Sequence, residues 1–87
     1  MNKKIIVVAR NVKSHEYKYA DIFECMDYID DTGDLLSNQV LFEFENTLMR
    51  NLKEFKFEFN IIVSEYIPDE IKEAKLNFDT LVSLGGR

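Results

Sequence analysis

The sequence predicts an α+β fold, in which a small two- to three-stranded sheet packs against about three helices in the order β-α-α-β-α. Three observations support this prediction: a short apolar run near the N-terminus, an alternating aromatic segment that begins at Phe55, and apolar residues at helical spacing between and after them. The 87 residues are expected to form one domain, 1–87, because two cores would each be too small to fold without disulfides or metals.

The first predicted strand runs from about Lys4 to Val12. Ile5 to Ala9 are apolar on both alternating faces, which is typical of a strand that is covered on both sides. The apolar stretch ends at Arg10, so it is too short for a signal peptide or a membrane span. The polar residues Lys13 to Glu16 are then expected to form a turn.

A first helix is predicted over about 20–31. Asp21 followed by Glu24 resembles an N-terminal capping pair, and Gly33 stands where a left-handed residue would end the helix. An alternative stays open, since Tyr17 and Tyr19 could belong to a short second strand. The apolar stripe of the helix would consist of Tyr19, Ile22, Phe23, Met26 and Ile29.

A second helix is predicted to start near Ser37 or Asn38, either of which could cap it. A rival interpretation makes 40–45 a strand, because apolar residues also alternate there. The helix is preferred because its apolar spacing persists for longer than a strand normally lasts. The residues at that spacing are Leu41, Phe44, Leu48, Leu52 and Phe55.

The clearest strand follows, from Phe55 to Val63, where aromatic and aliphatic residues alternate with polar ones. Pro68 then lies near the first turn of a final helix, which Gly85 and Gly86 end. Because two strands alone make a marginal sheet, a third strand or pairing across a dimer is expected. The apolar stripe of the final helix consists of Ile71, Ala74, Phe78, Leu81 and Val82.

Acidic residues are concentrated in one window of the sequence. Between Tyr19 and Met49 lie eight of the chain's 16 Asp and Glu residues and none of its 11 Lys and Arg residues, in a chain whose formal net charge is -5. The rest of the chain has more basic than acidic residues. We therefore expect the folded molecule to have one strongly acidic side.

On the predicted helix 20–31, the acids recur every three or four residues and would line one face. Successive carboxylates would then be about 4.5–6 Å apart, a step similar to that between phosphates along a nucleic-acid strand. An ordinary solvated face is an alternative that stays open. Two points count against it, because such like charges repel each other and acids near the end of a helix oppose its dipole. The candidate partner-binding residues are Asp21, Glu24, Asp27, Tyr28, Asp30, Asp31, Asp34, Glu43 and Glu45.

No catalytic, cofactor-binding or metal-binding residues are predicted. His15 is the only histidine and lies in a predicted polar turn, so a solvated side chain is expected. The acids between Asp27 and Asp34 do not match the spacing of a calcium-binding loop. The single cysteine, Cys25, excludes an internal disulfide and favours a reducing cytoplasm.

In size, acidity and lack of catalytic motifs, the chain resembles the small inhibitors that phages and mobile elements encode, including DNA mimics and anti-CRISPR proteins. This likeness is one of type and rests on no motif. It implies a non-enzymatic protein of the cytoplasm that inhibits or regulates a protein partner by docking on its basic, nucleic-acid-processing surface. Direct binding to nucleic acid is not expected, because affinity for phosphate needs basic residues. Membrane binding is not expected either.

Two alternatives remain open. Phe42 and Met49 lie seven residues apart and off the main apolar stripe, so they either form an apolar patch or fill the core. As a patch they would contact a partner or a second protomer, and the second case would support a homodimeric structural or assembly module. A weaker alternative is a small nuclease or toxin that uses His15 together with Arg10 and Lys13.

Overall fold

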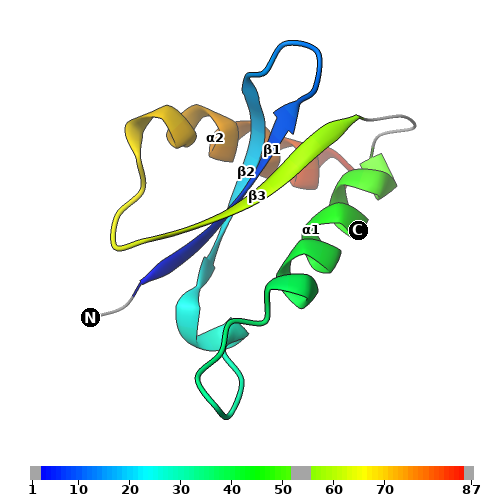
Figure 1. Cartoon of the computed structure of the whole chain (residues 1–87). Coiled ribbons are helices and arrows are strands. Elements are labelled where there is room, and N and C mark those ends of the chain that lie inside the picture. Colours follow the sequence, from blue (N-terminus) through cyan, green and yellow to red (C-terminus); the bar gives the residue numbers. More distant parts are fainter. Residues whose placement is uncertain (1–2, 52–55, 86–87) are drawn as a thin grey trace.

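The computed structural model of the protein describes residues 3–51 and 56–85. Its elements are β1 (Lys4–Asn11), β2 (Tyr17–Glu24), the 3-10 helix η1 (Cys25–Tyr28), α1 (Ser37–Asn51), β3 (Phe57–Ser64) and α2 (Asp69–Gly85). The strands form one antiparallel sheet in the order β2-β1-β3 (Figure 1). The α+β class and a third strand are thus confirmed, whereas the described residues contain two α-helices instead of three.

β1 is the central strand, as its apolar sequence predicts. Each residue from Ile5 to Ala9 is fully buried, because the strand is paired along both edges and covered on both faces. One face, with Ile5, Val7 and Ala9, belongs to a core cluster that also contains residues of α1, namely Val40, Phe44 and Leu48. The other face, with Ile6 and Val8, belongs to a cluster that contains Ile71 and Ala74 of α2.

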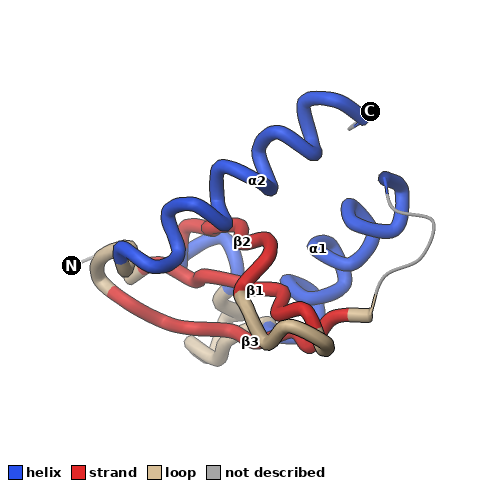
Figure 2. Tube along the Cα trace, turned by 90° about the horizontal axis from the view of Figure 1, so that it is seen from above, coloured by secondary structure: helices blue, strands red, loops and turns tan. Residues whose placement is uncertain are grey.

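α2 runs along the β2 edge of the sheet and contributes to both clusters (Figure 2). Ile71 and Ala74 in its first half pack on one face, whereas Phe78 packs in the cluster on the other face. Between these positions, Asn77 Nδ2 donates a hydrogen bond of 3.1 Å to the backbone oxygen of Lys18. α2 therefore covers the outer edge of β2 and protects it from pairing with another chain.

The predicted helix over 20–31 is wrong. Residues Tyr17–Glu24 form β2, which pairs with β1 so that Val7 faces Asp21 and Ile5 faces Phe23. The alternative that placed Tyr17 and Tyr19 in a strand is correct, and the strand extends further than predicted. The physical reason is that a fully buried strand must have its backbone groups paired on both sides, and β2 supplies the partner on one of them.

The remaining elements agree with the sequence. α1 confirms the second helix and excludes the rival strand at 40–45, and β3 and α2 confirm the last strand and helix. Pro68 directly precedes α2. Leu52, Phe55 and Gly86 lie outside the described residues. In the described part of the chain, neither α-helix has the length and apolar character needed to cross a bilayer.

Candidate partner-binding surface

The predicted partner-binding residues come from four elements and not from one helix face. Asp21 and Glu24 lie on β2, Asp27 and Tyr28 on η1, the next three acids in the turn before α1, and the last two on α1. The regular carboxylate ladder expected from the helix 20–31 does not exist. Asp21 and Glu24 belong to a strand, Asp27 to a 3-10 helix, and Asp30 and Asp31 to a turn, so these side chains do not follow one helical spacing.

Six exposed carboxylates nevertheless gather at one end of the molecule. We call this set the acidic pole: Glu24, Asp27, Asp30, Asp31, Asp34 and Glu43. It lies where β2 ends, η1 turns the chain and α1 begins, at the bottom of Figure 1. Asp21 and Glu45, the other two acids of the window, are half-buried and are not included.

Within residues 3–51 and 56–85, the ion pairs join Lys72 to Asp69, and Lys75 to Asp21 and Asp79. None of them engages the acidic pole. The basic residue placed opposite a member of the pole is Lys4, which faces Glu24 across the β1–β2 pair. The pole therefore has little compensation for its negative charge within the described chain.

The turn from Asp30 to Asp34 is held by its own hydrogen bonds. Asp30 Oδ1 accepts from the backbone nitrogens of Thr32 and Asp34, at 3.0 and 2.9 Å, and from the Thr32 hydroxyl at 2.7 Å. These bonds lower the pKa of Asp30, chiefly through the Thr32 hydroxyl. Gly33 closes the turn with a φ of 90°, which a residue with a Cβ rarely adopts. Asp31 and Asp34 are thus presented on a defined turn.

The acids near the predicted helix end do not oppose a helix dipole in the fold. Asp30, Asp31 and Asp34 precede the first turn of α1 and do not end a helix. The first turn of α1 contains no acidic residue, and a helix dipole acts mainly within one turn of the helix end. The position of these acids is therefore not a stability cost in itself. Their mutual repulsion remains.

Tyr28 ties η1 to α1. Its hydroxyl donates a hydrogen bond of 2.9 Å to Glu43 Oε2, and its ring packs edge-on against Phe23 at a centroid distance of 4.7 Å. Burial, the hydrogen bond to Glu43 and the nearby acidic charges raise the pKa of Tyr28 from 10.0 to about 12. The sequence predicted that Tyr28 contacts a partner. In the structure, its hydroxyl and ring join η1 to α1 and to β2 within the acidic pole.

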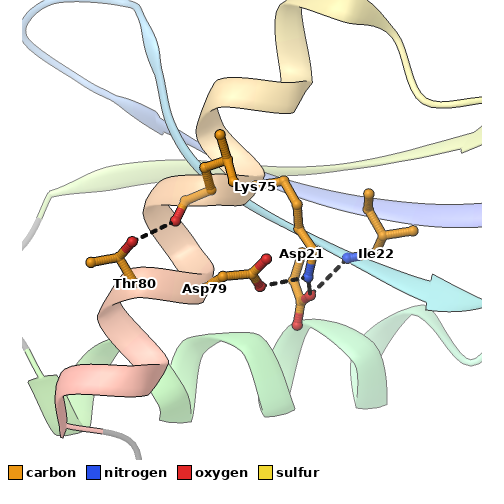
Figure 3. A network of polar contacts seen from close by, with 6 residues as sticks. Asp21, Ile22, Lys75, Asp79 and Thr80 are labelled. Atoms are coloured by element: carbon orange, nitrogen blue, oxygen red, sulfur yellow. Dashed lines mark hydrogen bonds and ion pairs between the residues drawn. The ribbon is translucent and has the colours of Figure 1, made fainter.

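Asp21 differs from the other acids because it has its own lysine. Lys75 Nζ lies 2.6 Å from Asp21 Oδ1 and 2.8 Å from Asp79 Oδ1, so it bridges β2 and α2 (Figure 3). Burial disfavours the charged ammonium, but the hydrogen bonds to Asp21 and Asp79 outweigh it and raise the pKa of Lys75. Sequence reasoning missed this network, although the spacing of Lys75 and Asp79 on a predicted helix indicated half of it.

Basic residues lie toward the opposite end of the molecule. They flank the β1–β2 turn and the segment where α1 ends and β3 begins, at the top of Figure 1. Glu16 and Glu58 interrupt them. Lys3 and Lys4 lie at the start of β1, near the acidic pole, so the separation of charge between the two ends is partial. The basic residues of this end are Arg10, Lys13, Lys18, Arg50 and Lys56.

A cleft of about 430 Å³ opens between α1 and α2 and exposes part of the Lys75 network. Its walls bring together carboxylates, hydroxyls, an arginine and the edge of the core. Elsewhere, His15 lies exposed in the β1–β2 turn with a φ of 61°, and Cys25 is a half-buried thiol. The described residues contain no group of three side chains that could hold a metal ion. The cleft is lined by Asp21, Thr47, Arg50, Phe78, Asp79, Val82 and Ser83.

Comparison of the chain with protein-family models, with curated proteins and with solved structures finds no match.

Proposed function

We propose that this protein is a non-enzymatic inhibitor or regulator whose acidic pole docks on a basic surface of a nucleic-acid-processing protein. The observation that supports this proposal is the gathering of six exposed carboxylates at one end of the molecule, none of them in a described ion pair. A partner that brings arginines or lysines would relieve their mutual repulsion. Encoding by a phage or mobile element, as for DNA mimics and anti-CRISPR proteins, fits this mode of action.

The way in which the pole is built suits binding more than solubility alone. The turn from Asp30 to Asp34 and the bond between Tyr28 and Glu43 fix the positions of several carboxylates before a partner arrives. Fixed groups lose less conformational freedom on binding. A concentrated negative potential also steers a basic partner and raises its association rate, an effect that salt weakens.

The test compares two triple variants of equal net charge. The pole variant carries Asp27→Asn, Asp31→Asn and Asp34→Asn, and leaves the structural Asp30 in place. The control variant carries Glu16→Gln, Glu70→Gln and Glu73→Gln, which are exposed acids outside the pole. Each protein is immobilised and used to capture proteins from a host lysate, and bound proteins are eluted with salt or with added DNA or RNA.

A nucleic-acid-binding protein retained by the wild type and the control variant, lost with the pole variant and released by nucleic acid would support the proposal. A partner that binds the pole variant as tightly as the wild type would contradict it. Unchanged thermal unfolding of both variants ensures that lost capture reflects charge and not folding.

A second candidate function is a homodimeric assembly module. The observation that favours it is the exposure of Phe42 (65%) and Met49 (61%) on α1, which shows that neither side chain fills the core. In this case sedimentation would find a dimer that salt does not dissociate and that forms without any other protein.

A further inference from the structure

The outer face of α1 carries an apolar pair that the fold does not use. Val40, Phe44 and Leu48 are buried against the sheet, whereas Phe42 and Met49 project from the opposite side of the same helix. Seven residues separate the two, so they lie in one line about 10.5 Å apart. Exposed apolar residues also occur elsewhere, as at Leu76 and Leu84 on α2, but the pair on α1 lies on the helix that leads to the acidic pole.

The residues around this pair are polar and, in part, acidic. Glu45 lies between Phe42 and Met49 along the helix, at the three- and four-residue spacing that places it beside both. Asn46 lies on the other flank and is exposed. We call these four residues, Phe42, Glu45, Asn46 and Met49, the α1 seam.

The α1 seam continues into the acidic pole. The pole surrounds the N-terminal end of α1, and Glu43, one of its members, is on the same helix one residue after Phe42. A molecule lying along α1 from Met49 toward Phe42 would therefore reach the pole. Its chemistry must match two apolar positions, a carboxylate between them and a strongly negative end.

A second copy of this chain, the occupant in the second candidate function, matches that chemistry less well than a basic partner does. None of the four seam residues is basic, so packing two α1 seams together would bring the Glu45 carboxylates of both copies into the contact with no base of the seam to pair them. Two apolar side chains from each copy also cover much less than the roughly 800 Å² per partner that a stable interface buries. Charge complementarity instead favours a basic partner.

We infer that the α1 seam binds an amphipathic, basic helix of the protein partner. Two apolar side chains of that helix, one heptad apart, pack beside Phe42 and Met49, and a Lys or Arg between them pairs with Glu45. Further basic residues at one end of the helix meet the acidic pole. This inference depends on the proposed function, because it specifies the part of the partner that the acidic surface would recognise.

The experiment uses a panel of short synthetic peptides with fluorescent labels and the full chain. Each peptide has two leucines seven positions apart. A Lys or Arg stands three or four positions after the first leucine, and further Lys or Arg residues lie on the polar face of the helix. A scrambled peptide keeps the same charges but disperses the leucines. A second control keeps the leucines and replaces the bases by Glu. Binding is measured by fluorescence anisotropy at low and at moderate salt.

The variant Phe42→Gln with Met49→Gln tests the seam. Leu76→Gln with Leu84→Gln is its matched control, since these leucines are equally apolar and are exposed on α2, at 64% and 83%. We expect the seam variant to weaken binding of at least one patterned peptide by about ten-fold or more. The control should change it by less than about two-fold, and the Glu-containing peptide should not bind.

The outcomes separate the inference from the proposed function. Scrambled and patterned peptides that bind the wild type equally, and that both lose affinity in the acidic-pole variant, would overturn the seam inference while supporting an acidic docking surface. Absence of binding by every basic peptide, even at low salt, would contradict both. A dimer in sedimentation that the seam variant abolishes would also overturn the inference, because the occupant would then be a second copy.

Discussion

Three aspartates of the same acidic window have three different environments. Asp21 is paired with Lys75 and accepts the backbone N–H of Ile22, whereas Asp30 accepts hydrogen bonds within its own turn. Asp31 is exposed and has no partner in the described part of the chain. The sequence predicted one role for all three, because it showed their number and the lack of bases nearby. It could not show that Lys75, 54 residues away, folds back onto Asp21.

The pKa of Tyr28 depends on burial and on the hydrogen bond to Glu43, which joins η1 to α1 within the acidic pole. Its pKa of about 12 in the folded protein exceeds the ordinary value of 10.0, so the folded state retains the proton longer than the unfolded chain. The resulting stabilisation is fully present below about pH 10 and is lost as the pH rises toward 12. Glu43→Gln should lower the pKa of Tyr28 toward its ordinary value, with burial still holding it somewhat above.

The measurement is the ultraviolet absorbance of tyrosinate as a function of pH, with Tyr28→Phe used to assign the signal. Glu45→Gln is the control, because this carboxylate is on the same helix and the hydroxyl of Tyr28 is bound to Glu43. Equal pKa values of Tyr28 in the wild type and in Glu43→Gln would show that the bond does not join η1 to α1.

At the scale of elements, β2 shows why apolar spacing alone did not predict the fold. Tyr19, Ile22 and Phe23 fit a helical stripe, but a window this short also fits the alternation of a strand. The spacing around α1 persists over more turns, and there the helix was predicted correctly. β2 forms because the backbone of the buried strand β1 needs hydrogen-bond partners on both sides. The apolar spacing of 20–31 does not reveal this requirement.

Two substitutions distinguish the strand from the predicted helix by their effect on stability. Ala20 is fully buried between Val8 and the α2 residues Ile71 and Ala74, whereas Met26, which the helix would have placed in the core, is 78% exposed. Ala20→Leu should lower the free energy of unfolding by about 1–3 kcal/mol, because the added atoms overfill this face. Met26→Gln should change it by less than about 0.5 kcal/mol.

Urea denaturation measures the change in the free energy of unfolding for each variant. The comparison requires that the dependence of this free energy on urea concentration is the same in the variants and in the wild type. The reverse ranking, with Met26→Gln the more damaging change, would indicate that the segment packs as the helix predicted from the sequence.

For the whole molecule, the sequence indicated where acids concentrate along the chain but not which elements bring them together. The absence of bases between Tyr19 and Met49 translates into an acidic end, because η1, the turn and the start of α1 are consecutive in the chain. The basic end could not be foreseen, since its residues come from β1, the β1–β2 turn, β2, α1 and the residue before β3. Only the antiparallel pairing of the sheet brings these distant segments to the same end.

A molecule with one acidic and one basic end should attract other copies head to tail when its net charge is near zero. The sequence pI is about 4.8, and near this pH at low salt we expect light scattering to detect weak attraction between molecules that added salt removes. The pole and control variants defined above lose the same number of charges, so their net charges remain equal.

The two variants differ only in where the charge is lost, and each is measured at its own isoelectric pH. The control variant should retain the attraction, because its acidic end is intact and its basic end has lost Glu16. The pole variant should lose most of it. Equal attraction in both variants would mean that self-association follows net charge alone, and that the acidic pole does not act as a unit in the field of the protein.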